Sequence, residues 1–361
     1  MKSLTARPVV SWVHCGDIHL KDRYNLGGMD RTTGLPLRFV DALDAIKKAV
    51  GWANDHKVDY LIFSGDVFDG PNPSEMCLQE FTQVVFSELH QSIDIVWLIG
   101  NHDTTGQYHA GQHLYSSGAD IRFLYEYTLR EVDDGKIGLH FLPWGSDLPQ
   151  ATAIRSLNIA IGHGEVRESK LGDYEKYCTA ESAWDPDVLR SCFDHVELTH
   201  FHTRQEFYIG ALVRSTFGEG TDPKGFTYTK VVRDAHGDES ELRVESVLVD
   251  VADRRFVQVE VATVAEFQSE DFGGDFSGNI VKVILGLEFP TSAREDLRKR
   301  ITEMGAIQVL TEKAKGSTVR SVSLPTQIQH PSEIVATYCK SLGMQDRTIT
   351  LGQEILRSCG V

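Results

Sequence analysis

Five short polar motifs, each placed directly after an apolar segment, constrain this chain more than any other feature of its sequence. In chain order the motifs are GDIH, GDVFD, GNHD, GHG and HFH, and the apolar segments before them begin near Val9, Tyr60, Ile93, Leu157 and Val196. Short apolar runs that end in turn residues are typical of buried strands. In open α/β sheets, ligands bind in the crevice beyond the carboxyl ends of the strands. The five motifs are therefore predicted to meet at one site.

Strands and helices alternate around these motifs. Apolar residues at helical spacing predict a helix over residues 37–56, which forms a β-α-β unit with the first two strands, and a second helix over 76–89. Further strands are expected near 121–125 and 137–142, and a hairpin over 231–251. Because strands outnumber helices, we expect a mixed, layered α/β domain and not a pure doubly wound sheet.

The C-terminal part of the sequence has a different pattern. A strand, a charged helix over 292–304 and two further strands predict a small α+β module. The segment 331–342 carries its apolar residues on one helical face, which suits a helix that packs on its own domain or docks on a partner. We therefore expect a larger domain over 1–262, the small module over 263–330 and a helical tail over 331–361.

Composition limits the class of protein. The chain has 361 residues, 41% of them hydrophobic, and a formal net charge of −16. Its apolar runs are shorter than the ~20 residues that a membrane helix needs, and no secretory signal is expected, so the predicted location is cytoplasmic. The six cysteines are scattered with no CxxC pair, which favours reduced thiols and excludes a cysteine-based metal site. The acidic charge disfavours a nucleic-acid partner unless a local basic strip, bound cations or a partner subunit offsets it.

The five motifs together offer seven side chains that can bind a metal ion. They are two carboxylates, one amide and four imidazoles, namely Asp17, Asp66, Asn101, His19, His163, His200 and His202. Mixed oxygen and nitrogen ligands suit Mn²⁺, Fe²⁺ or Zn²⁺, and seven groups exceed the needs of one ion. Two ions that share one carboxylate are the simplest interpretation, and such a pair can polarise a phosphoryl oxygen and activate a water.

Each motif also has a structural explanation. Asp17 and Asp66 suit helix N-caps, Asn101 with Asp103 suits a turn, and a pair such as His200 and His202 arises by chance on loops. The coincidence of all five motifs at strand ends favours the metal site. His109 and His113 have helical spacing but no matching carboxylate, so we expect them to be solvated.

The order D-x-H, G-D-x-x-D, G-N-H-D, G-H and H-x-H resembles the calcineurin-like metallophosphoesterase superfamily, whose fold is a layered β-sandwich flanked by helices. The resemblance implies that a first ion is held by Asp17, His19, Asp66 and His202, and a second by Asp66, Asn101, His163 and His200. It assigns His102 as the acid or transition-state stabiliser. Asp69 and Asp103 are expected to orient His102 or the ligand histidines.

Two longer segments, GDVFDGPNPSE and HFHTRQEFYIGALVRSTFGEGTDPKGF, are similar to the SbcD nucleases and to the Mre-eleven (meiotic recombination eleven) nucleases. Ala211 departs from that pattern, which has serine at this position, and Thr199 departs from the superfamily pattern, which usually has glycine before H-x-H. The resemblance implies a capping domain after the catalytic domain and a coiled-coil, ABC-type ATPase partner of the SbcC kind. It also makes a homodimer plausible, with the helix over 76–89 as one contributor.

These patterns predict a DNA exonuclease and endonuclease that uses two divalent ions, with Mn²⁺ favoured, and acts in DNA repair or recombination near the nucleoid. Arg204, Arg214 and Lys224 are candidates for phosphate contacts or for ordinary surface positions. One alternative is a metallophosphoesterase of small phosphodiesters or phosphoproteins. Another is a scaffold that has lost its metals, but none of the seven ligand groups is missing.

Overall fold

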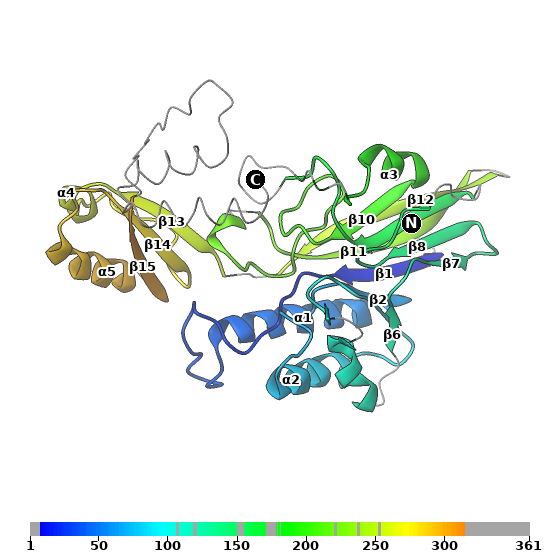
Figure 1. Ribbon diagram of the computed structural model, residues 1–361, viewed down its shortest axis with the longest axis horizontal. Coiled ribbons are helices and arrows are strands. Elements are labelled where there is room, and N and C mark those ends of the chain that lie inside the picture. Colours follow the sequence, from blue (N-terminus) through cyan, green and yellow to red (C-terminus); the bar gives the residue numbers. More distant parts are fainter. Residues whose placement is uncertain are drawn as a thin grey trace, which may run out of the picture. The chain divides into compact units, whose positions relative to one another are not determined.

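The computed structural model describes residues 8–314 except 106–107, 118–120, 150–154, 171–177, 179, 181, 220–221, 237–238 and 252–253. Two β-sheets pack face to face within this part of the chain, with helices on the outer face of each (Figure 1). The predicted mixed, layered α/β architecture is confirmed.

The larger sheet has six strands. In spatial order they are β12 (Glu239–Asp250), β11 (Gly225–His236), β1 (Val10–Cys15), β2 (Tyr60–Ser64), β3 (Asp94–Leu98) and β6 (Ile121–Leu124). Strands β1, β2, β3 and β6 are parallel, and β11 joins β1 in antiparallel register. The carboxyl ends of the four parallel strands therefore lie along one edge of this sheet.

The second sheet has four strands. They are β10 (His195–Thr199), β9 (Leu157–His163), β8 (Ile137–Leu142) and β7 (Thr128–Val132), in that order. Strands β8, β9 and β10 are parallel, whereas β7 pairs with β8 in antiparallel register. A small hairpin of β4 (Thr104–Thr105) and β5 (Tyr108–His109) follows β3 and leads into the 3₁₀ helix η1 (Ala110–Ser117).

Helices α1 (Leu37–His56) and α2 (Glu75–Phe86) cover the outer face of the larger sheet, side by side in Figure 1. Their apolar residues recur at helical spacing, as the sequence predicts for α1, and Ser74 caps α2 by accepting a hydrogen bond from the N–H of Cys77. Helix α3 (Pro186–Cys192) belongs to the hydrophobic cluster on the outer face of the second sheet.

Strand β1 shows how the pleat separates the layers. Trp12 packs in the core between the two sheets, whereas Val13 and Cys15 pack in the core beneath α1 and α2. Successive side chains of a strand point to opposite faces, so a fully apolar strand can fill two cores at once. This explains why β1, β2 and β3 are nearly continuous apolar runs that end abruptly at polar motifs.

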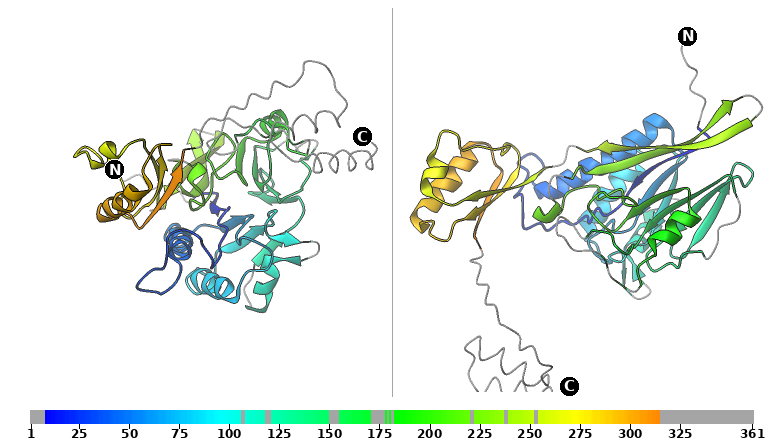
Figure 2. Two further views of the ribbon diagram at one scale, coloured as in Figure 1. Left: turned by 60° about the vertical axis from the view of Figure 1, so that its left-hand side comes forward. Right: turned by 90° about the horizontal axis from the view of Figure 1, so that it is seen from above.

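A smaller three-stranded sheet follows, made of β13 (Phe256–Val261), β14 (Ile280–Leu285) and β15 (Gln308–Lys313). Figure 2 shows the helices α4 (Val264–Gln268) and α5 (Arg294–Glu303) beside this sheet. They contribute Phe267, Leu297 and Ile301 to its separate core. The short 3₁₀ helix η2 (Phe217–Glu219) comes directly before β11 in the chain, and η3 (Thr291–Ala293) comes directly before α5. The predicted domain boundaries stay predictions, and the tail 331–361 lies outside the described residues.

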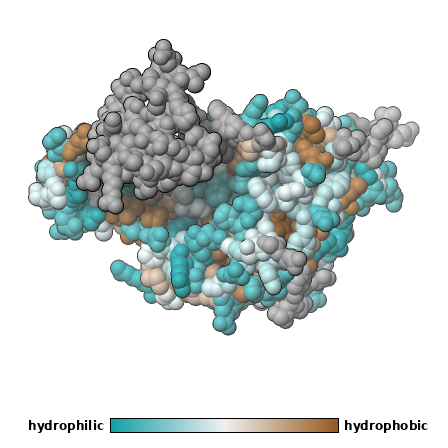
Figure 3. Space-filling model, in the orientation of Figure 1, coloured by the Kyte–Doolittle hydropathy of each residue, from teal (hydrophilic) through white to brown (hydrophobic). Residues whose placement is uncertain are grey.

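Some elements differ from the sequence-based expectation. The hairpin begins at Gly225 and not at Val231, and its first strand carries the buried polar residues Thr227 and Thr229, which hide its strand pattern. Elements α3, β7 and β13 are found where none was expected. None of the described helices is long and apolar enough to cross a membrane. Hydrophilic residues cover most of the described surface on the face drawn in Figure 3, and hydrophobic residues form several separate patches.

Candidate metal centre

Every predicted ligand lies at or just beyond the carboxyl end of a parallel strand. The loops after β1, β2 and β3 carry Asp17 and His19, Asp66, and Asn101. The second sheet supplies the others from the end of β9 and from the loop after β10. Because the two sheets stack, their carboxyl-terminal edges meet, and the loops that the sequence predicts to converge do converge.

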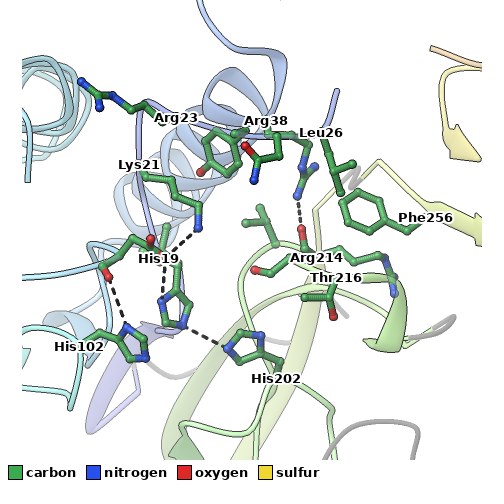
Figure 4. Close-up of a pocket in the computed structure, with 16 residues that line it drawn as sticks. His19, Lys21, Arg23, Leu26, Arg38, His102, His202, Arg214, Thr216 and Phe256 are labelled. Carbon is green, nitrogen blue, oxygen red and sulfur yellow. Dashed lines mark hydrogen bonds and ion pairs between the residues drawn. The ribbon is translucent and has the colours of Figure 1, made fainter. Parts of the chain in front are cut away.

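The first group of side chains consists of Asp17, His19 and His202, which can offer ligand atoms all within 4.8 Å of one another. The Nε2 atoms of His19 and His202 lie 3.2 Å apart, although 183 residues separate them in the chain (Figure 4). This group matches three of the four ligands predicted for a first ion.

The second group consists of Asp66, His163 and His200, again with ligand atoms within 4.8 Å. The side-chain oxygen of Asn101 joins it, 2.9 Å from Nε2 of His163 and 3.1 Å from Nδ1 of His200. These are the four ligands predicted for a second ion.

Asp66 lies between the two groups. Its Oδ2 atom is 3.7 Å from Nε2 of His19 and 3.6 Å from Nε2 of His163, one imidazole from each group. Its Oδ1 atom accepts a hydrogen bond of 2.8 Å from the backbone N–H of His102, which fixes the carboxylate in this position. The structure therefore places Asp66 where a shared carboxylate would have to be.

Several polar atoms inside the centre face one another as acceptors, an arrangement expected of metal ligands and not of hydrogen-bonded pairs. Asp17 Oδ1 is a buried carboxylate oxygen with no hydrogen-bond partner in the described part of the chain. The facing atoms of His163 and Asn101 are a ring nitrogen and an amide oxygen, which both carry lone pairs once Nδ1 of His163 holds the proton. Acceptors about 3 Å apart are expected for two ligands of one cation with bonds of ~2.1 Å.

Each imidazole directs its other nitrogen to an oxygen atom outside the centre. Nδ1 of His163 faces the carbonyl oxygen of Ser64 at 3.0 Å, and Nδ1 of His202 faces Glu219 at 3.3 Å. Nε2 of His200 lies 3.5 Å from Glu165. Such outer acceptors hold the proton on one nitrogen and leave the other free to bind a metal. The sequence did not predict Glu165 or Glu219 as site residues. Glu219 does lie within the longer segment that is similar to the SbcD nucleases, which is the one signal that could have found it.

Burial sets the charge state of the centre. It raises the pKa of Asp17 and Asp66, and it lowers the pKa of His163 and His200 to about 3. Burial also lowers the pKa of His202, but the hydrogen bond to Glu219 and the charge of Asp17 outweigh it and raise that pKa. In the metal-free centre His163 and His200 are therefore neutral, whereas the two carboxyls and His202 hold protons that a bound divalent cation would displace.

The loops at the centre have unusual backbone conformations. Asp17, His19, Asp66 and His200 all have positive φ, at 49°, 47°, 52° and 105°. Non-glycine residues rarely adopt such values, and residues that do cluster at functional sites. The β2 loop adds Gly65, where an added Cβ atom would lie only 2.2 Å from Nδ1 of His163. Sharp turns thus direct the ligands from several strand ends to one point.

His102, the predicted acid, stands exposed beside both groups. Its ring packs edge-on against the ring of His19, with 4.7 Å between the two ring centroids (Figure 4). Its Nδ1 donates a hydrogen bond of 3.3 Å to the backbone carbonyl of Asp69. The Asp69 carboxylate forms an ion pair with Lys21 at 2.9 Å and lies 3.7 Å from Nδ1 of His19. Asp69 therefore contacts both histidines, through different atoms.

Asp103 contacts backbone rather than histidines. It is fully buried and accepts hydrogen bonds from the backbone N–H groups of Asp66, Val67 and Gly100, and from the Trp97 indole. Burial raises its pKa to about 7, while the four donors favour its ionised form. Its observed contacts join the β2 and β3 loops and so position Asp66, whereas the sequence suggested that it orients an imidazole.

Three expectations about other residues need correction. Lys224 is buried and binds Glu219 at 2.9 Å, so it lies neither on the surface nor free to contact a phosphate. Arg214 is also buried and donates to the backbone carbonyls of Glu219 and Asp222. His109 is buried against Tyr125, because the chain after β3 forms a hairpin and a 3₁₀ helix and not a solvated α-helix. Arg204 is exposed, and an ordinary surface position is one of the two alternatives that the sequence offers for it.

Two stacked α/β sheets with oxygen and nitrogen ligands gathered at their strand ends define the class of metallophosphoesterases. The sequence pattern of the calcineurin-like phosphoesterase family matches residues 11–216, and the chain belongs to that family. Its members typically bind two divalent metal ions.

Two individual proteins are similar to this chain. The DNA double-strand break repair protein Mre11 of Thermoplasma acidophilum is 31% identical over 110 residues, which cover 28% of this chain and 28% of that protein. The match thus spans little more than a quarter of that relative. The crystal structure of a dimetal phosphatase from Danio rerio aligns with 68% of this chain and 100% of its own, with 11% sequence identity and a TM-score of 0.36.

Proposed function

We propose that this metallophosphoesterase is a DNA exonuclease and endonuclease of the SbcD type. The observation that carries the proposal is a cavity of about 440 Å³ that opens beside His19, His102 and His202. Lys21, which is paired with Asp69, and the exposed Arg23 also line it (Figure 4). A chain of formal charge −16 that gathers basic side chains next to its metal ligands is suited to a phosphate chain longer than the reacting group.

The partial likeness to Mre11 supports the same substrate class. That relative is named as a DNA double-strand break repair protein, and its 31% identity extends over 110 residues. DNA repair or recombination is accordingly the proposed setting, and the nucleoid within the cytoplasm the proposed location.

The two groups of side chains in the metal centre indicate which residues would hold the two divalent metal ions. Asp17, His19, Asp66 and His202 would hold one divalent ion, and Asp66, Asn101, His163 and His200 the other, with Mn²⁺ as the proposed metal. When bound, such a pair polarises a phosphoryl oxygen and lowers the pKa of a water.

His102 is the proposed general acid. Its Nδ1–H is engaged by the carbonyl of Asp69, and its ring is exposed, so Nε2 is the nitrogen available to substrate. In the protonated ring, Nε2–H would pass its proton to the departing sugar oxygen as the phosphorus–oxygen bond breaks, leaving a neutral imidazole with its proton on Nδ1. Such proton transfer contributes typically ~10²–10⁴-fold to rate.

A direct comparison of substrates tests the proposal. With Mn²⁺ present, we expect end-labelled linear duplex DNA to be shortened, and bis(p-nitrophenyl) phosphate to be hydrolysed poorly. We expect His102→Asn to lower the rate by about 10²–10⁴-fold with two ions still bound, and Asp66→Asn to abolish both binding and activity. His56→Asn is the matched control, because His56 ends α1 at the opposite edge of the sheet.

Two outcomes would contradict the proposal. Efficient cleavage of the small ester with intact DNA would favour the alternative, an esterase of small phosphodiesters or phosphoproteins. Unchanged activity in Asp66→Asn would show that the assigned groups do not carry the reaction.

The partners are proposals as well. An SbcC-like ATPase is the proposed partner, but the segment expected to dock it, 331–361, lies outside the described residues. The proposed homodimer contact, α2, buries Cys77, Phe81 and Val85 in its own core and leaves polar residues such as Gln79 exposed. A time course on end-labelled DNA with and without the ATPase would measure its contribution.

A further inference from the structure

A buried carboxylate, Glu197, lies in the middle of the protein and is not part of the metal centre. It is fully buried on β10, in the space between the two sheets. Its two oxygens accept hydrogen bonds from Trp12, His14, His195, Thr227, Thr229 and Ser246. Although burial raises its pKa, the contacts with His14 and His195 lower that pKa well below its usual range. Burying a carboxylate lowers the stability of the fold unless hydrogen bonds satisfy its oxygen atoms, and six contacts do so here.

A continuous chain of contacts runs from Glu197 to the metal centre. Nδ1 of His14 lies 3.0 Å from Glu197, and Nε2 of His14 lies 2.5 Å from the hydroxyl of Ser64. The Ser64 hydroxyl lies 2.8 Å from the hydroxyl of Thr199, which in turn lies 3.0 Å from Nδ1 of His163. All five side chains are buried, so no solvent competes for these contacts.

The end of this chain determines the protonation of His163. Its Nδ1 lies 3.0 Å from the carbonyl oxygen of Ser64, and a carbonyl can only accept a hydrogen bond. Nδ1 therefore carries the proton, and Nε2 presents its lone pair to Asn101 and Asp66 inside the centre. The Thr199 hydroxyl accepts from the same N–H and donates to the Ser64 carbonyl, so it holds both partners in place.

We propose that Thr199 is a positioning residue for His163, fixed from behind by Ser64 and the His14–Glu197 pair. In this chain the hydroxyl fixes which nitrogen of His163 faces the metal and limits rotation of the ring. Outer contacts of this kind change metal affinity by typically 10–100-fold.

Substitution of Thr199 with measurement of Mn²⁺ binding tests the proposal. By isothermal titration calorimetry, we expect Thr199→Val, which keeps the shape but removes the hydroxyl, to weaken one of the two Mn²⁺ sites by about 10–100-fold. Thr199→Ser should restore the affinity to within about threefold. Ser11→Ala is the matched control, because it removes a buried hydroxyl that bonds Asp59 and that lies outside both the Glu197 cluster and the metal-binding side chains. It should bind Mn²⁺ as the unsubstituted protein does.

A measurement on the unsubstituted protein covers the case in which Thr199→Val fails to fold. Long-range ¹H–¹⁵N correlation spectra of the metal-free protein report the tautomer of His163, and the Nδ1–H form is expected. An Nε2–H form would overturn the proposal, as would two Mn²⁺ sites of unchanged affinity in Thr199→Val. None of these readouts involves DNA, so failure of the nuclease proposal would leave this test intact.

Discussion

At the residue scale, the metal centre depends on a balance between buried acids and buried bases. Asp17 is fully buried and has one oxygen without a hydrogen-bond partner among the described residues, and two of the four imidazoles have a pKa of about 3. Without a metal, the cheapest way to bury such a carboxyl is to protonate it. With a metal, the ion replaces that proton.

Metal binding is therefore expected to release protons from the carboxyl groups and from His202, whose pKa is raised as well. Because the pKa of Asp17 and of Asp66 is raised, apparent Mn²⁺ affinity should fall as the pH is lowered from about 8 to about 6. His163 and His200 are neutral throughout this range, so they should contribute no protons. Calorimetric titration at about pH 6.5 in two buffers of different ionisation enthalpy measures the number released.

The variant Asp17→Asn provides the control, because it should release fewer protons on binding. Equal binding enthalpies in both buffers would mean that the carboxyls are already ionised in the metal-free protein.

At the element scale, the strand-end loops are the parts that make the centre possible. The β3 loop illustrates the close packing, because a Cβ atom at Gly100 would lie 2.3 Å from Oδ1 of Asp66 and 2.5 Å from its backbone nitrogen. The same loop holds Asp103, whose carboxylate braces the backbone of the β2 loop. Two neighbouring loops thus fix the carboxylate that lies between the two ligand groups.

We expect Gly100→Ala to displace the Asp66 carboxylate and to weaken Mn²⁺ binding by about 10–100-fold, while the fold persists. The matched control is Gly51→Ala in the middle of α1, where an added Cβ meets nothing within 4 Å. That substitution should leave metal affinity unchanged and should stabilise the protein by about 0.5–1 kcal/mol, because glycine is a poor helix former. Binding titrations and urea unfolding measure the two effects.

Equal Mn²⁺ affinity in Gly100→Ala and Gly51→Ala would show that the β3 loop can move away from Asp66 at little cost. The close approach of these loops would then not be needed for metal binding.

At the scale of the whole molecule, metal binding and stability are coupled. The ligands come from both sheets, through segments as distant as Asp17 and His202, so ions bound between them link the two sheets. The part of the chain that gathers these ligands is also acidic overall, and divalent cations offset some of that charge.

Removal of metal is therefore expected to lower the melting temperature. At a free Mn²⁺ concentration of about 100 times Kd, each site should stabilise the folded state by ~2.7 kcal/mol relative to the EDTA-treated protein. Thermal unfolding followed by circular dichroism measures this difference. Asp17→Asn should lose a large part of the Mn²⁺-dependent rise, and a full rise in that variant would contradict the assigned ligand set.

The sequence by itself determined the layered α/β class and the strands that end in ligand motifs. Strands β1, β2, β3 and β9 are short, mostly apolar runs, and each stops where a polar motif begins. These signals are local, because strand burial and turn chemistry depend on neighbouring residues. The same local patterns concealed β11, where Thr227 and Thr229 are polar yet buried against Glu197.

Only the tertiary structure decided which side chains act together. The position of Asp66 between the two groups, the outer contacts of Glu165 and Glu219, and the path from Glu197 to His163 join residues far apart in the chain. A sequence pattern reports what each segment prefers, but not which segments stack. The contacts form only when the two sheets pack face to face and bring the ends of their parallel strands together.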